Sequence, residues 1–146
     1  MTPYADLWAK LWNREVDLRG STLAAVEGAA GEVIILLAPA YVIGSGDEPA
    51  RNGGACWSAD VEIALNGADP RSATPATPSW IADGFVDLAG CARMLHLSLP
   101  SSVEGDLTVY IITENGGELL VKARRMEVAL RGEPAFAEML DPDYFR

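Results

Sequence analysis

The sequence predicts a mainly β protein, an antiparallel β-sandwich or open barrel of about seven strands with a short helix at each terminus. Apolar and polar residues alternate in several short runs, as in half-buried strands. Turn-forming residues separate these runs, and helical spacing of apolar residues occurs near the two ends of the chain. The 146 residues can bury one sizeable core, so we expect a single domain. Its expected parts are an amphipathic helix at 1–16, a β-sandwich at 17–132, and a helix and tail at 133–146.

The two predicted helices each carry an apolar stripe. In the N-terminal segment the stripe contains Leu7, Trp8, Leu11 and Trp12. We expect it to pack on the domain, and the alternative is that Trp8 and Trp12 form a docking face for a partner. In the C-terminal segment, helical spacing follows Pro134 at Phe136, Met139 and Leu140.

The first half of the predicted β-domain contains three strands. We expect a short strand at 21–27 and a long, mostly buried strand at 32–43 that is bent or ended by Pro39. Residues 57–66 alternate most regularly, which predicts a strand with Trp57 and every second residue after it inward.

The second half combines loops and hairpins. The proline-rich segment 69–79 predicts an irregular loop, and Ala82-Asp83-Gly84 indicates a hairpin turn. The strongest hairpin signal is Asn115-Gly116, which lies between predicted strands at 107–113 and 118–130. The inward residues of the later strand change phase near Arg124-Arg125, which predicts a β-bulge.

The charge of the chain bears on its partners. The formal net charge is -10, which is poorly suited to nucleic acid but attracts a basic protein. The basic cluster of Lys122, Arg124, Arg125 and Arg131 alternates with apolar residues, so we interpret it as a solvated strand face. The most apolar run, 33–43, is shorter than the roughly 20 residues of a membrane-spanning helix. The N-terminus lacks a signal-peptide pattern, so we expect a cytoplasmic protein.

Few residues are suited to catalysis or metal binding. The single histidine, His96, lies in an alternating run in which we expect Leu95, Leu97 and Leu99 to point inward. His96 should therefore lie on the exposed face, where a structural role is favoured over catalysis. Cys56 and Cys91 form no CxxC pair, and either reduced thiols or one disulfide between them fit the sequence. We expect no cofactor and no metal site.

The glycine-rich segment 44–57 predicts a connecting loop. Its glycines allow unusual backbone conformations, but it supplies no nucleophile, base or phosphate cradle. If the loop binds a ligand, the candidate residues are Tyr41, Asp47, Glu48, Arg51 and Trp57. A small-ligand pocket lined by Tyr41, Trp57 and Trp80 is the related alternative.

Several short motifs resemble those of a family of uncharacterised bacterial proteins of similar length. Most of residues 18–138 take part, whereas the tryptophan-rich N-terminus and the prolines at 75 and 78 lie outside the resemblance. The resemblance implies an all-β domain with no assigned activity, and it assigns no catalytic residues. The motifs are Leu18 with Ser21 and Leu23, Pro39-Ala40-Tyr41-Val42, Trp57, Asp83-Gly84, Leu97-Ser98-Leu99-Pro100, and Arg131-Gly132-Glu133-Pro134 with Phe136.

Together these observations predict a non-catalytic binding protein that engages a protein partner. One concrete form is an immunity-type protein that neutralises a basic toxin, since acidic inhibitors associate rapidly with basic enzymes. The alternatives are a small-ligand binder with an aromatic pocket and an enzyme that uses carboxylates or His96.

Overall fold

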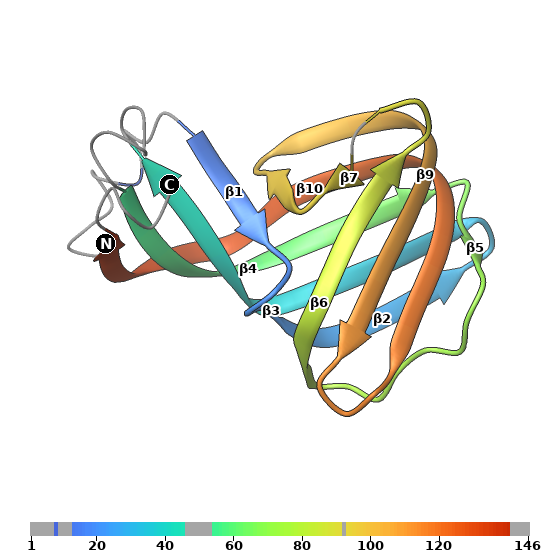
Figure 1. Cartoon of the computed structure of the whole chain (residues 1–146), viewed down its shortest axis with the longest axis horizontal. Helices are drawn as coiled ribbons and strands as arrows, with labels where there is room; N and C mark the ends of the chain where they lie inside the picture. Colours follow the sequence, from blue (N-terminus) through green and yellow to red (C-terminus); the bar gives the residue numbers. More distant parts are fainter. Residues whose placement is uncertain (1–7, 9–12, 46–53, 92, 141–146) are drawn as a thin grey trace.

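Ten strands in one antiparallel sheet make up the part of the chain that the structure describes. The computed structural model describes Trp8 and residues 13–45, 54–91 and 93–140 (Figure 1). The strands are β1 (Asn13–Asp17), β2 (Thr22–Ala29), β3 (Glu32–Ser45), β4 (Gly54–Asn66), β5 (Asp69–Pro70), β6 (Ser79–Leu88), β7 (Arg93–Met94), β8 (His96–Ser98), β9 (Ser101–Thr113) and β10 (Glu118–Leu140).

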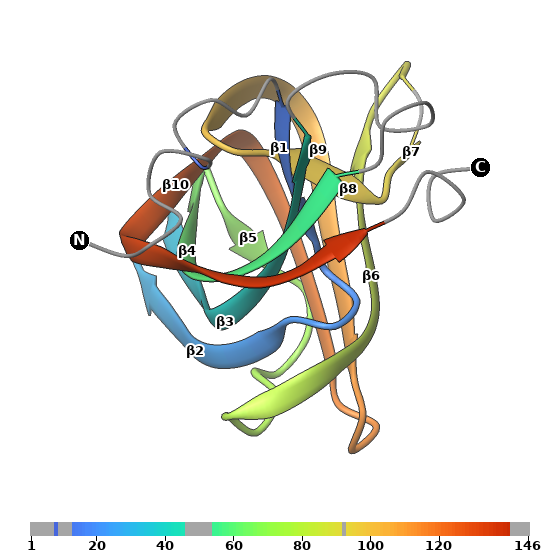
Figure 2. The ribbon, with the colours of Figure 1, turned by 90° about the vertical axis from the view of Figure 1, so that its left-hand side faces the viewer.

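The sheet coils back on itself without forming a fully paired barrel. Its strand order is β2-β6-β9-β10-β4-β3-β1-β8, and β2 also pairs with β3. The coil closes where β2 meets β6, through only two residue pairs, Thr22↔Trp80 and Leu23↔Ser79. Figure 2 shows this coil from the side. The mainly β, antiparallel prediction is therefore confirmed, but there are ten strands in place of about seven, and they do not separate into two sheets.

The predicted C-terminal helix is absent from the described residues, and most of the predicted N-terminal helix, apart from Trp8, which is helical, lies outside them. Residues 13–16 belong to β1, and β10 continues through 133–140. The tail pairs with β4 through Ala135↔Ser58 and Phe136↔Trp57. Hydrogen bonding to β4 and the contact of Phe136 with Trp57 thus outweigh the local helical spacing.

Long strands divide the sheet into a coiled part and an extension. The first half of β3 pairs with β2, and after a register shift at 37–40, next to Pro39, its second half pairs with β1. The proline therefore bends β3 but does not end it. Figure 1 shows β3, β4 and β10 leaving the coil to lie beside β1. One cluster of buried apolar side chains runs through both parts.

Alternation correctly predicted much of the core. In β4, the residues buried on the inner face are Trp57, Ala59, Val61, Ile63 and Leu65. Leu97 and Leu99 are also buried, but Leu95 is 47% exposed because it lies in a bend between β7 and β8, where the alternation is interrupted.

The turn predictions had mixed outcomes. The Asn115-Gly116 hairpin joins β9 to β10, and the predicted bulge appears as a register shift between Ala123 and Arg125. The hairpin predicted at Ala82-Asp83-Gly84 is wrong, since β6 runs through it with a register shift between Ile81 and Asp83. A Cβ at Gly84 would lie 3.2 Å from the Leu18 side chain and 3.2 Å from the Tyr110 carbonyl oxygen. Glycine at this position thus allows β6 to pack closely on Leu18.

Candidate partner-binding face

Trp57, a predicted ligand-binding residue, lies in the core. Its side chain is fully buried, and its ring meets Trp8 edge-on with centroids 5.1 Å apart and Phe136 with centroids 5.5 Å apart. Trp8 therefore packs on the domain, as the first interpretation of the N-terminal stripe expected. The other predicted docking residue, Trp12, lies outside the described residues.

Two other predicted ligand-binding residues, Tyr41 and Trp80, do not lie beside Trp57. Tyr41 and Trp80 flank Gly20, where an added Cβ would lie 3.7 Å from the Tyr41 Cβ and 4.0 Å from the Trp80 Cζ2. Tyr41 is opposite Ser58 in the β3–β4 ladder, so it faces away from Trp57. The sequence-based prediction of one pocket lined by Tyr41, Trp57 and Trp80 is therefore corrected, because Trp57 and Tyr41 point to opposite faces of the sheet. Asp47, Glu48 and Arg51 lie outside the described residues.

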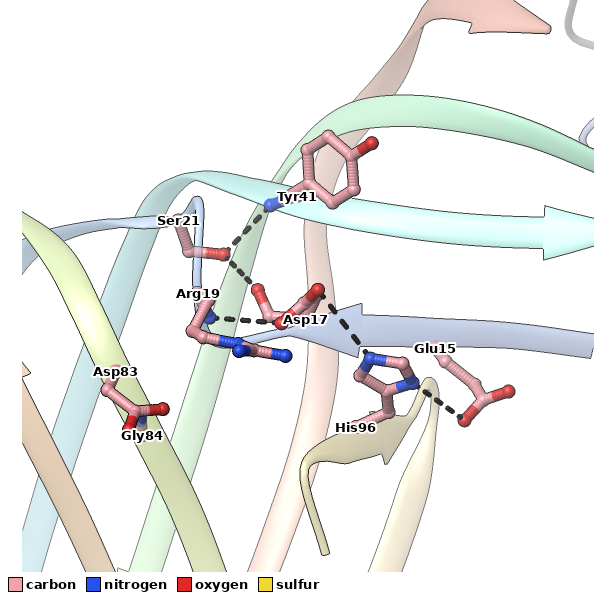
Figure 3. Close-up of polar contacts among 8 residues, drawn as sticks. All are labelled: Glu15, Asp17, Arg19, Ser21, Tyr41, Asp83, Gly84 and His96. Atoms are coloured by element: carbon pink, nitrogen blue, oxygen red, sulfur yellow. Dashed lines mark hydrogen bonds and ion pairs between the residues drawn. The ribbon is translucent and has the colours of Figure 1, made fainter. Parts of the chain in front are cut away.

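His96 lies between two carboxylates of the neighbouring strand β1 (Figure 3). Its Nε2 is 3.6 Å from Asp17 Oδ2, and its Nδ1 is 3.8 Å from Glu15 Oε2. The interaction with Asp17 raises the pKa of His96 against the opposing effects of partial burial and of Arg19, and Glu15 adds to the rise. Both ring nitrogens face carboxylates, so neither is directed toward a substrate from which it could take a proton.

Groups near His96 are also engaged in the fold. The Ser21 hydroxyl donates to the Asp17 carbonyl at 2.7 Å and accepts from the Tyr41 amide at 2.9 Å (Figure 3). Ser21 thus connects β1 to β3 through hydrogen bonds to the main chain. This geometry favours an electrostatic link between strands over a nucleophile–base pair.

Both cysteines are free thiols. Cys56 is buried, and burial raises its pKa, so the thiol stays protonated at neutral pH. Cys91 is exposed. The described residues contain no group of three or more His, Cys, Asp or Glu side chains placed to hold a metal ion. Nor do they include a helix long and apolar enough to cross a membrane.

The outer surface of β6, β9 and β10 carries aromatic rings next to carboxylates. Phe85 and Tyr110 point outward because their neighbours along each strand are buried. They are opposite each other in the β6–β9 ladder, with ring centroids 5.1 Å apart. Two residues further along β9, Ile112 is opposite Asp83 of β6 on one side and opposite Glu118 of β10 on the other. We call this surface the carboxylate–aromatic face and define it as Asp83, Phe85, Asp87, Tyr110 and Glu118.

One end of this face holds a guanidinium from the same chain. Arg93 donates from Nε to Asp87 Oδ1 at 2.8 Å and from Nη2 to Oδ2 at 3.1 Å. Its guanidinium carbon lies 3.6 Å from the centroid of the Phe85 ring. The hydrogen bonds from Arg93 lower the pKa of Asp87. An aromatic ring and a carboxylate therefore bind a cation here by cation–π contact and by a two-point hydrogen bond.

The other end has a similar set of groups. The Tyr110 hydroxyl donates to Glu118 Oε1, and this bond, with the charges of Glu118 and Asp83, raises the pKa of Tyr110. Within the described ranges, neither Asp83 nor Glu118 takes part in an ion pair. In the described part of the chain, the Tyr110 end thus has a ring and two carboxylates that form no ion pair, although the charge of Asp83 also acts on the nearby Arg93.

The predicted basic strand face is exposed but largely neutralised. Its arginines form ion pairs with carboxylates on their own or neighbouring strands. The pairs are Arg124 with Asp106, Arg125 with Glu104 and Glu127, and Arg131 with Glu62. This surface is therefore not an uncompensated basic patch, and the molecule keeps its overall attraction for cations.

Comparison with protein-family models, with curated proteins and with solved structures found no match to the chain.

Proposed function

We propose that this is a non-catalytic binding protein that engages a basic protein partner through the carboxylate–aromatic face. One observation carries the proposal: the Phe85 end of the face binds a guanidinium, whereas the Tyr110 end presents a ring and two carboxylates that form no ion pair with any described residue. An arginine or lysine of the partner is expected to bind next to Tyr110, between Asp83 and Glu118. An immunity-type protein that neutralises a basic toxin remains the concrete form of this proposal.

General energetics support this choice of partner. A cation over an exposed aromatic ring contributes about 0.5–1 kcal/mol, and tyrosine and arginine are common in the residues that dominate interface energies. The net charge of -10 steers a basic protein toward the molecule as a whole. The face then adds a specific contact to this long-range attraction.

A matched pair of double variants tests the site. The first is Asp83→Asn with Glu118→Gln, which keeps the acceptor oxygens but removes both charges at the Tyr110 end of the face. The second, Glu27→Gln with Glu133→Gln, removes the same charge from exposed positions on β2 and β10. The probe is a fluorescein-labelled arginine-rich peptide, and the measurement is its dissociation constant by fluorescence anisotropy.

We expect the first double variant to bind the peptide about two- to thirtyfold more weakly, because each exposed ion pair contributes about 0.2–1 kcal/mol. The second should show a clearly smaller loss, since it changes only the net charge. Equal losses in the two variants would mean that the peptide responds to charge alone, and the site would then be wrong.

A further inference from the structure

Arg93 fills one end of the carboxylate–aromatic face in the way that an arginine of a partner would. Its guanidinium makes a two-point hydrogen bond to Asp87 and lies over the Phe85 ring. These are the contacts by which a carboxylate and an aromatic ring recognise arginine at a protein surface. The charge of Asp83 also acts on Arg93. The chain therefore places one of its own side chains in a site that is suited to a guanidinium.

The contacts of Arg93 are made at the surface and from a very short strand. The side chains of Arg93 and Asp87 are 54% and 40% exposed. Strand β7 pairs only with β6, through Val86↔Met94 and Asp87↔Arg93. Met94 packs against the core cluster and so holds β7 in place. Exposed side chains change rotamer rapidly, so the Arg93 side chain can turn into solvent while the strand stays paired.

The two ends of the face lie close enough for one segment of a partner to reach both. Phe85 and Tyr110 are opposite each other, with ring centroids 5.1 Å apart. Asp87 on β6 and Glu118 on β10 are separated by β9, and two strand spacings amount to about 10 Å. In an extended peptide, side chains two residues apart point the same way and are about 6.8 Å apart. Because arginine side chains are long, two arginines at this spacing can reach both ends.

We propose that the carboxylate–aromatic face is a two-arginine site, and that Arg93 occupies its Phe85 end until an arginine of the partner displaces it. The inference rests on the proposed function, which assigns the partner's other arginine to the Tyr110 end. Once that first arginine is bound, the second competes with Arg93 for Asp87 from within the complex, at a high effective concentration. Arg93 thus favours partners that carry two arginines two residues apart over partners that carry one.

A charge-matched pair of variants tests the role of Arg93. Arg93→Gln removes the internal guanidinium, and Arg131→Gln removes the same charge from an exposed ion pair with Glu62. The probes are two fluorescein-labelled peptides of equal charge, one with Arg-Ala-Arg and the other with Lys-Ala-Lys at its centre. Lysine keeps the charge but lacks the planar fork that makes the two-point hydrogen bond. Fluorescence anisotropy gives the dissociation constants.

We expect Arg93→Gln to bind the Arg-Ala-Arg peptide about three- to thirtyfold more tightly than the wild type does. The second arginine then gains an exposed ion pair and a cation–π contact without displacing another side chain. Arg131→Gln should give a clearly smaller gain, and so should either variant with the Lys-Ala-Lys peptide. In ¹H–¹⁵N spectra of the wild type, the Arg93 Nε–H signal should shift saturably with Arg-Ala-Arg and much less with Lys-Ala-Lys.

Equal gains for Arg93→Gln and Arg131→Gln, or no gain for Arg93→Gln, would overturn the proposal. An Arg93 signal that does not respond to saturating Arg-Ala-Arg peptide would also overturn it, and this result decides even if Arg93→Gln fails to fold. Failure of the proposed function looks different. It would make peptide binding to the wild type insensitive to Asp83→Asn with Glu118→Gln, whereas failure of the two-arginine site alone leaves that sensitivity intact.

Discussion

At the scale of single residues, His96 illustrates how a side chain acquires a role from neighbours that are distant in the sequence. It lies at the edge of the sheet, and its side chain is 41% exposed. Its position between Glu15 and Asp17 makes it an electrostatic contact between β8 and β1. Because imidazole carries a charge only when protonated, this contact depends on pH.

The pH dependence of stability follows from the direction of the His96 pKa shift. A histidine whose pKa is raised by folding stabilises the protein fully below its unfolded pKa of about 6.5, and the contribution disappears as the pH rises through the folded pKa. We expect His96→Gln to lower the free energy of unfolding between about pH 5 and 6.5 by roughly 0.2–1 kcal/mol, the range for exposed ion pairs. At pH 9 the variant and the wild type should be equally stable.

Urea unfolding of both proteins across this pH range measures the effect. Taking the difference between the two proteins removes the contributions of all other titrating groups. A loss of stability that is the same at pH 5.5 and pH 9 would show that His96 acts through packing and not through its charge.

At the scale of elements, β6 shows how packing converts a turn signal into a continuous strand. Asp-Gly commonly forms a hairpin turn, but here Gly84 lies inward beside Leu18 and opposite Ile111 of β9. The absence of a side chain lets the backbone of β6 approach the core closely. The same glycine positions Phe85 outward, next to Tyr110.

Adding one methyl group at Gly84 tests this packing. We expect Gly84→Ala to lower the free energy of unfolding by about 1–3 kcal/mol, because the new Cβ would lie 3.2 Å from Leu18 and from the Tyr110 carbonyl. Gly28→Ala is the matched control, since a Cβ there meets nothing within 4 Å. It should be neutral or slightly stabilising.

Denaturant midpoints of the two variants measure the difference. If Gly84→Ala is as stable as Gly28→Ala, then close packing of β6 on Leu18 is not what requires glycine at this position.

The terminal segments show a related effect at the scale of elements. Phe136 follows Pro134 at a spacing that is typical of a helix start, yet it lies in β10. Its ring meets the buried Trp57, and its main chain pairs with the same residue. Burial against a partner far away in the sequence therefore decides the conformation, because local helix preferences amount to less than about 1 kcal/mol per residue.

At the scale of the whole molecule, charge determines how a partner approaches. Most of the basic residues on the β10 surface form ion pairs within the chain. With a net charge of -10, we therefore expect the molecule to present a mainly negative surface to a partner. Such a surface accelerates the association of a basic protein. At physiological ionic strength, salt screens the attraction between charges that lie more than about 8 Å apart.

We therefore expect the association rate constant of the arginine-rich peptide to fall steeply as sodium chloride is raised, while the dissociation rate constant changes less. Stopped-flow fluorescence over a series of salt concentrations gives both constants. A glutamate-rich peptide of equal length serves as the control and should show no binding. An association rate that is independent of salt would contradict electrostatic steering.

The candidate site was only partly predictable from the sequence. The acidic charge and the basic-partner hypothesis follow from composition, but Phe85, Asp87 and Tyr110 did not stand out in the sequence. They belong to a common surface only because β6 pairs with β9. The predicted aromatic residues were conspicuous for their size, and Trp57 proved to be buried for the same reason, since a large indole stabilises most when it leaves water.

The sequence by itself determined the β class, the inward face of β4 and the hairpin between β9 and β10. These features depend on a two-residue period and on Asn-Gly turn chemistry, which act between near neighbours. Only the tertiary structure decided that the terminal segment 133–140 is a strand, that His96 meets Glu15 and Asp17, and that Tyr110 lies beside Asp83. Those outcomes depend on which strands pair, and strand pairing is decided by burial and hydrogen bonding between segments far apart in the chain.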